Sequence, residues 1–89
     1  MREGTKRIVR YLESKKIIGK KHTPEKKLLK RMFLNIPQKN ERNNILKEYN
    51  ALITIGYIMK TRKKTGKGSD WHISLNPRKI KEINRLLEE

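Results

Sequence analysis

A basic segment in the carboxyl-terminal third of the chain carries the side chains whose chemistry is easiest to interpret. Five cations lie between positions 60 and 67 with no acidic residue among them: Lys60, Arg62, Lys63, Lys64 and Lys67. Gly66 and Gly68 allow the positive φ angles that a tight reversal between two strands requires. The segment is predicted to be a β-hairpin with a cationic tip, which suits a phosphate backbone better than catalysis. The alternative is a solvated loop without a partner.

The overall charge agrees with a polyanionic partner. The 89 residues include 24 Lys and Arg against 9 Asp and Glu, a formal net charge of +15. Repulsion among so many like charges opposes folding, so a partner that neutralises them is the natural interpretation. A charged surface of the kind found in thermophiles is the alternative, but such surfaces usually balance Glu against Lys. The length predicts one small domain over residues 1–89.

Several classes of function are not supported by the residues present. Cysteine is absent, and His22 and His72 are too few for a metal site without thiolates, so no metal or other cofactor is expected. The loop around Lys67 does not have the spacing of a phosphate-binding loop of nucleotide triphosphatases. We therefore expect no enzyme and no small-molecule substrate. Apolar runs are too short for a membrane span, and residues 1–16 lack the apolar centre of a secretory signal. A cytoplasmic protein without a membrane partner is predicted.

Apolar periodicity and capping residues predict four helices around the hairpin. They cover residues 5–16, 24–34, 40–55 and 77–88, and the hairpin covers 57–75. Thr23 is expected to cap the second helix with Pro24 as its first residue, and Gly56 is expected just after the third helix. Asn76 and Pro77 repeat the capping pattern before the last helix. The fold class is thus α+β and mostly α.

The hairpin and the third helix each show two distinct faces. In the second strand, apolar and polar side chains alternate, so Trp71 and His72 are on opposite faces. Trp71 is expected to anchor the core; the alternative is that a nucleic-acid base stacks on its ring. In the third helix, Tyr49 and Leu52 belong to the face expected to be buried. The opposite, exposed face is predicted to include Arg42, Asn43, Lys47, Asn50 and Thr54, with Asn44 beside them.

The order of these elements resembles that of the winged helix-turn-helix family. The resemblance covers Pro24 to Pro77. It depends on the helix start at Thr23-Pro24-Glu25, on the junction Leu52-Ile53-Thr54-Ile55-Gly56-Tyr57-Ile58, and on the basic hairpin with its return strand Trp71-His72-Ile73-Ser74-Leu75. The resemblance implies a three-helix core, a β-hairpin wing and a C-terminal helix. It also implies that the third helix enters the major groove while the wing contacts the backbone or an adjacent minor groove.

The residues that would face nucleic acid follow from that resemblance. On the third helix they are Asn40, Arg42, Asn43, Asn44 and Lys47, and on the wing they are Lys60, Arg62, Lys63, Lys64 and Lys67. Asparagine can pair with adenine N6 and N7, and arginine or lysine with guanine O6 and N7. Three asparagines in the first turns of a helix are poor helix formers, so they need another reason to be there. The alternative is that they are capping and surface residues only.

Double-stranded DNA is therefore the predicted partner, and a small transcriptional regulator is the predicted function. Two alternatives remain open: an RNA-binding or ribosome-associated winged helix that uses the same basic face, and a DNA-packaging protein that is indifferent to sequence. The stripe Ile80, Ile83 and Leu87 of the last helix could cover the core, or it could pair with its copy in a homodimer through the terminal helices.

Overall fold

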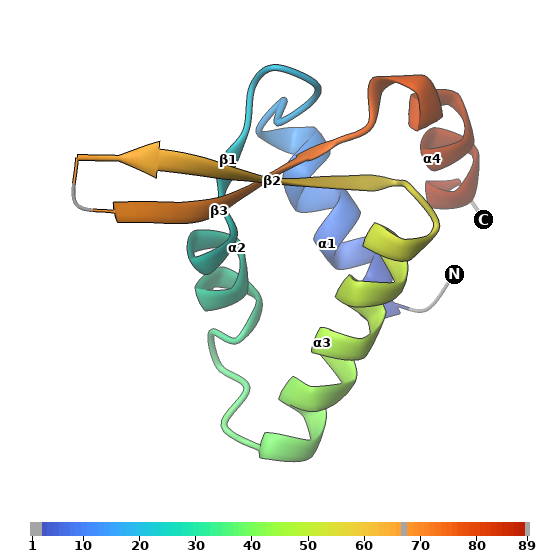
Figure 1. Ribbon diagram of the computed structural model, residues 1–89. Coiled ribbons are helices and arrows are strands. Elements are labelled where there is room, and N and C mark those ends of the chain that lie inside the picture. The colour runs from blue at the N-terminus through green and yellow to red at the C-terminus, as the bar shows by residue number, and fades with distance from the viewer. Residues whose placement is uncertain (1–2, 67, 89) are drawn as a thin grey trace.

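The computed structural model describes residues 3–66 and 68–88 of the chain. Within them lie four α-helices, a short 3-10 helix and three strands (Figure 1). Their order is α1 (Glu3–Ser14), β1 (Thr23–Pro24), α2 (Glu25–Met32), α3 (Lys39–Thr54), β2 (Ile58–Thr65), β3 (Gly68–Leu75), η1 (Pro77–Lys79) and α4 (Ile80–Leu87). The predicted α+β, mostly helical class and the hairpin between the third and fourth helices are confirmed.

The three strands form one antiparallel sheet in the order β1-β3-β2. Strands β2 and β3 form the hairpin and pair from its inner end, where Ile58 lies opposite Leu75, out to its tip. Strand β1 pairs with the other edge of β3, where Thr23 lies opposite Ile73. Ile18 forms a further isolated bridge to Leu75. The inner end of β3 is therefore held on both sides, while the outer end of the hairpin extends away from the helices (Figure 1).

Strand β1 corrects the predicted start of the second helix. Thr23 and Pro24 were expected as a cap and a first helical residue, but both are in the strand, and α2 begins at Glu25 without a side-chain capping bond. Pro24 has φ −60° and ψ 135°, an extended conformation. Proline has no N–H to donate to a neighbouring strand, and β1 tolerates it because β1 is at the edge of the sheet. Thr23 is buried opposite Ile73, as suits a β-branched residue in a sheet.

The core lies where α1, α2 and α3 meet the inner end of the hairpin. The cluster of buried apolar residues draws on every element except β1 and the 3-10 helix, and also on the turn after α1. Its members are Ile8, Val9, Leu12, Ile17, Leu28, Met32, Tyr49, Leu52, Ile58, Ile73, Leu75 and Ile83. Tyr49 and Leu52 of α3, which helical periodicity placed on the buried face, belong to this cluster.

Local signals placed the end of α3 and the start of the last helical segment well. Gly56 follows the helix with φ +88°, where the N–H groups of Gly56 and Tyr57 donate to the carbonyls of Ile53 and Leu52 at 3.1 and 3.0 Å. These two bonds form a Schellman motif, which favours glycine because of the positive φ. Asn76 accepts from the N–H of Arg78 at 3.1 Å, as a capping residue should.

The position of Trp71 contradicts the expected core anchor. Its side chain is 43% exposed, because it lies farther out on the hairpin than Ile73 and Leu75, beyond the helices that cover them. Lys60 and Arg62 lie over its ring, with the ammonium nitrogen and the guanidinium carbon 4.8 and 5.5 Å from the centroid. Trp71 therefore organises the cations of the hairpin rather than the core.

Helix α4 covers the core from the carboxyl-terminal side. Ile83 is fully buried, while Ile80 and Leu87 are packed against the core and partly exposed. The Tyr57 hydroxyl donates to a Glu82 carboxylate oxygen at 3.3 Å and joins α4 to the start of the hairpin. Covering the core thus accounts for the stripe, and pairing of two copies through the terminal helices stays a prediction. No helix among the described residues has the length and apolar character to span a membrane.

Candidate nucleic-acid interface

The amino-terminal half of α3 presents one exposed polar stripe. Asn40, Asn43, Asn44 and Lys47 follow the spacing i, i+3, i+4 and i+7 that puts residues on one side of a helix, and all four are exposed. Tyr49 and Leu52 hold the other side of the same helix in the core. The structure therefore gathers these four predicted residues on a single surface of α3.

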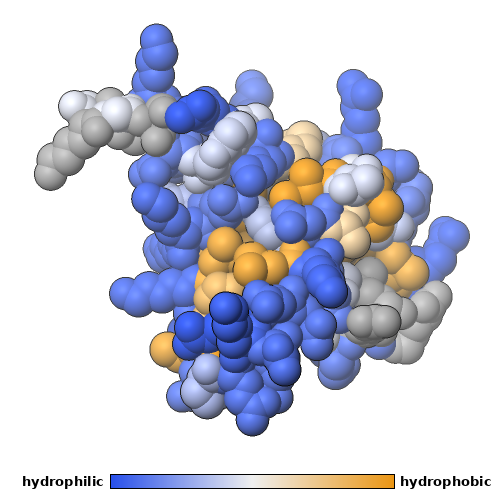
Figure 2. All heavy atoms as spheres, turned by 60° about the horizontal axis from the view of Figure 1, so that its bottom comes forward, coloured by the Kyte–Doolittle hydropathy of each residue, from blue (hydrophilic) through white to orange (hydrophobic). Residues whose placement is uncertain are grey.

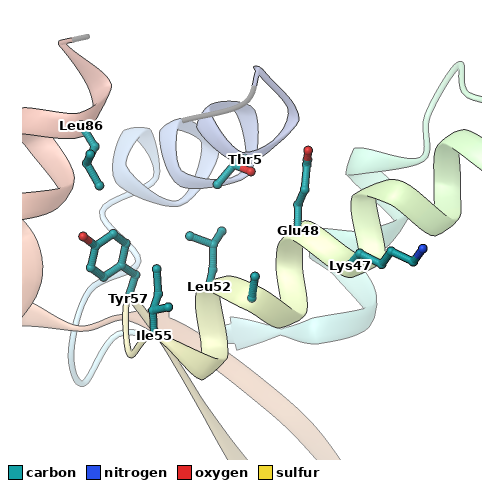
Figure 3. A pocket seen from close by; sticks show the side chains of 8 residues that line it. Thr5, Lys47, Glu48, Leu52, Ile55, Tyr57 and Leu86 are labelled. Atoms are coloured by element: carbon teal, nitrogen blue, oxygen red, sulfur yellow. The ribbon is translucent and has the colours of Figure 1, made fainter.

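Lys47 and Asn44 mark the two margins of this stripe. Lys47 borders an apolar hollow of about 460 Å³ between α1, α3 and α4. Figure 3 shows Ile55, Tyr57 and Leu86 on one side of this hollow and the Lys47 side chain extending away from them. Asn44 lines a second hollow beside α1. The ammonium group of Lys47 is thus directed away from the apolar surface at the carboxyl end of α3.

Arg42 lies beside the stripe rather than in it, and its contact with nucleic acid stays a prediction. It precedes Tyr49 by seven residues, or about two helical turns, so the two residues share the side of α3 that faces the rest of the molecule. Its Nε donates to the Ile36 carbonyl at 2.6 Å, and its guanidinium lies 5.4 Å from the Phe33 ring centroid. Arg42 therefore fastens the loop between α2 and α3, although its side chain is exposed.

The cations of the hairpin are divided between its two faces. Arg62 pairs with Trp71 and Lys63 pairs with Asp70 across the strands. Because side chains alternate along a strand, Arg62 and Lys64 share the face of Lys60 and Trp71, and Lys63 is on the opposite face. Arg62, Lys63 and Lys64 are exposed. Lys67, also predicted to contact phosphate, lies outside the described residues.

Lys60 is engaged within the protein. Its ammonium nitrogen lies 2.9 Å from a carboxylate oxygen of Glu25, and the Tyr49 hydroxyl donates to the same oxygen at 2.6 Å. Burial, followed by the hydrogen bond and the charge of Glu25, raises the pKa of Tyr49, so its hydroxyl remains a donor. Lys60 thus joins the hairpin to α2 and α3, and Glu25 engages its charge within the protein.

The predicted residues therefore form two surfaces. In Figure 1 the hairpin tip is at the left and the start of α3 is at the bottom, with α2 and the following loop between them. Figure 2, seen from the side on which α3 begins, shows a mostly hydrophilic face interrupted by apolar areas. A ligand that contacts both surfaces must be extended, as a nucleic-acid duplex is.

Sequence reasoning missed the cations of α2 and of the segment before β1. Lys27 and Arg31 have the spacing i and i+4, which puts both on one side of α2 next to the apolar stripe. Lys15 and Lys21 lie near them around a hollow of about 480 Å³. The helical spacing was visible in the sequence, but the approach of the end of α1 to α2 was not.

Two histidines connect the segment before β1 to β3. The Nδ1 atoms of His22 and His72 are 2.8 Å apart, and the rings meet edge to face. One Nδ1 must donate and the other accept, so at least one of the two rings is neutral. Partial burial, then the nearby charges of Lys63 and His72, lower the pKa of His22 below its ordinary value of 6.5.

This histidine pair predicts a loss of stability on mild acidification. The unfolded chain takes up the His22 proton near pH 6.5, whereas the folded chain takes it up only at lower pH. The unfolded state then binds more protons, so stability is complete above this range and falls as pH decreases through it. Urea denaturation from about pH 7.5 to about pH 5.5 should show this fall, and a smaller one in His22→Gln. An NMR titration midpoint for His22 at or above 6.5 would contradict the assignment.

The chain matches no protein-family model, no curated protein and no solved structure.

Proposed function

We propose that this protein is a winged-helix protein that binds double-stranded DNA, and that it acts as a small transcriptional regulator. Helix α3 enters the major groove, and the hairpin formed by β2 and β3 lies along the phosphate backbone. Arg62, Lys63 and Lys64 supply affinity. Sequence discrimination comes from the exposed stripe of α3, whose members are Asn40, Asn43, Asn44 and Lys47.

The observation that carries this proposal is the exposed amide-rich stripe on a helix that leads directly into a cationic hairpin. Asparagine amides offer a donor and an acceptor together, which suits adenine in the major groove. A helix with its side chains is about 10–12 Å wide and the groove is about 12 Å wide, so α3 has the size to enter it. The outer end of the hairpin exposes Arg62, Lys63 and Lys64, which suits the negatively charged backbone.

The connectivity supports the same proposal. The order α1, β1, α2, α3, β2, β3 with β1 paired to β3 resembles the arrangement of winged helix-turn-helix domains. The short strand β1, which the sequence did not indicate, strengthens this likeness. Arg42 also donates to the Ile36 carbonyl in the connection between α2 and α3, where a helix-turn-helix has its turn.

Selection from random duplexes tests the regulatory part of the proposal. The wild-type protein should enrich a defined motif, and Asn43→Ala with Lys47→Ala should weaken discrimination between that motif and a scrambled duplex by about tenfold to a hundredfold, since each good base contact contributes about 1–3 kcal/mol. The affinity for the scrambled duplex should fall less, because only one phosphate-binding cation is lost.

The matched control for this variant is Lys81→Ala with Asn84→Ala, which removes the same two residue types from exposed positions of α4. It should leave discrimination unchanged. Two results would contradict the assignment of α3: equal losses on the motif and on the scrambled duplex, or a selection that yields no motif. The second result would favour the packaging alternative.

A further inference from the structure

A second cationic surface lies between the end of α1, the segment before β1, and α2. Two adjoining hollows of about 480 and 260 Å³ share Tyr11, Lys27 and Arg31 in their walls. Together they form a basic groove, whose polar and charged walls are Tyr11, Lys15, Lys21, His22, Thr23, Lys27, Lys30 and Arg31.

Among the residues that the structure describes, no carboxylate lines this basic groove. Three other hollows of the described surface each include at least one glutamate: Glu48 in the first, Glu3 and Glu41 in the second, and Glu13 in a third. Four lysines and one arginine around the groove have no ion pair with any described residue. Their charges are therefore available to an external anion, and their mutual repulsion favours binding one.

The groove also contains a flat surface beside the charges. The guanidinium carbon of Arg31 lies 6.0 Å from the centroid of the Tyr11 ring, and Tyr11 is half-buried. A guanidinium held near a ring is restricted in its orientation and keeps its donors for phosphate oxygens. Repeated cations around a tyrosine suit a phosphodiester chain, which offers regularly spaced charges, better than a single small anion.

The basic groove touches the hairpin at one end, where His22 contacts His72 and Thr23 pairs with Ile73 of β3. Lys26 approaches Asp70 of β3 at 3.6 Å on one side of α2, whereas Lys27 and Arg31 face α1. No residue that lines the groove belongs to α3, β2 or β3. A duplex that lies on α3 and the hairpin would thus leave these cations without a partner.

We propose that the basic groove binds the backbone of a second nucleic-acid segment, so that one protein molecule holds two segments together. This inference rests on the proposed function, because it assumes that α3 and the hairpin bind a duplex. Each surface then uses a separate set of cations: Arg62, Lys63 and Lys64 on the hairpin, and Lys21, Lys27 and Arg31 in the groove.

A bridging assay tests this inference. A short duplex is fixed to beads, the protein is added, and retention of a second, fluorescent duplex of the same sequence is measured. The wild-type protein should retain the second duplex. The variant Lys21→Ala, Lys27→Ala, Arg31→Ala should reduce retention by about tenfold or more, because about three phosphate contacts are lost, while its affinity for one duplex changes less than threefold.

The control variant Arg78→Ala, Lys81→Ala, Arg85→Ala removes the same charge from η1 and α4, and it should retain the second duplex. Sedimentation at the assay concentration measures the oligomeric state, and retention of the second duplex by a dimer alone would overturn the inference. Retention unchanged in the groove variant would overturn the inference, as would an equal loss of affinity for a single duplex, since the groove would then belong to the first interface. If the wild-type protein bound no single duplex, the proposed function itself would fail. That result is distinct from a failure of the bridging inference, in which one duplex binds but the groove variant still retains the second.

Discussion

Replacing Arg62, Lys63 and Lys64 together with alanine is expected to weaken duplex binding by about a hundredfold at about 0.1 M salt. The three side chains are exposed on β2, and none of them belongs to the buried core. Each lysine or arginine that meets a phosphate releases a condensed cation from the duplex. The slope of log K against log salt should therefore become shallower by about 3, from a wild-type value near −5 for about six phosphates.

The control for charge alone is again the variant of Arg78, Lys81 and Arg85. It lowers the net charge by the same amount on the opposite side of the molecule in Figure 1. Fluorescence anisotropy over a range of salt concentrations measures both variants. The account requires a shallower slope for the hairpin variant only. If both variants lost the same affinity, the effect would come from total charge, and the hairpin would not be the contact surface.

Replacing Glu25 with alanine is expected to destabilise the fold by roughly 2–3 kcal/mol. Glu25 accepts from the Tyr49 hydroxyl at 2.6 Å and pairs with Lys60 at 2.9 Å. Tyr49 is only 1% exposed, so without Glu25 its hydroxyl keeps no acceptor and little water. An unsatisfied buried donor costs about 1–3 kcal/mol. The Lys60 pair adds a smaller amount because its lysine is partly exposed.

Urea denaturation followed by circular dichroism measures this effect. Tyr49→Phe should cost about 1 kcal/mol, because it removes the donor and leaves the Glu25–Lys60 pair in place. The double variant should cost less than the sum of the two, since the residues share one bond. Glu88→Ala, on an exposed residue at the end of α4, is the control. A loss for Glu25→Ala no larger than for Glu88→Ala would show that this network does not hold the hairpin to the helices.

The parts of the fold that depend on neighbours in the chain were predictable from the sequence. Gly56 ends α3 because the required positive φ suits glycine, and Asn76 caps the following turn through its own side chain. Strand β1 was not predictable, because its two residues form a strand only by pairing with β3, about fifty positions later. Thr23 and Pro24 carry the same local signal as a helix start, and the distant partner decided between the two.

The same distinction separates the residues of the candidate interface. The stripe of α3 followed from helical spacing, which is local. Trp71 was misplaced because alternation gives its face but not how far the helices extend beneath the hairpin. The hydrogen bond of Arg42 to Ile36 was not predictable, because it depends on the shape of the loop before α3. The basic groove was missed because α1 and α2 meet there only in the folded chain.

Titration of four labelled ligands of matched sequence, at two salt concentrations, tests the central claim most directly. The ligands are duplex DNA, duplex RNA, single-stranded DNA and single-stranded RNA. The account predicts that duplex DNA binds at least about tenfold more tightly than the others, because the deep, narrow major groove of A-form RNA excludes a helix such as α3. It also predicts that binding weakens steeply with salt. Tighter binding of duplex RNA or of a single strand would contradict the claim.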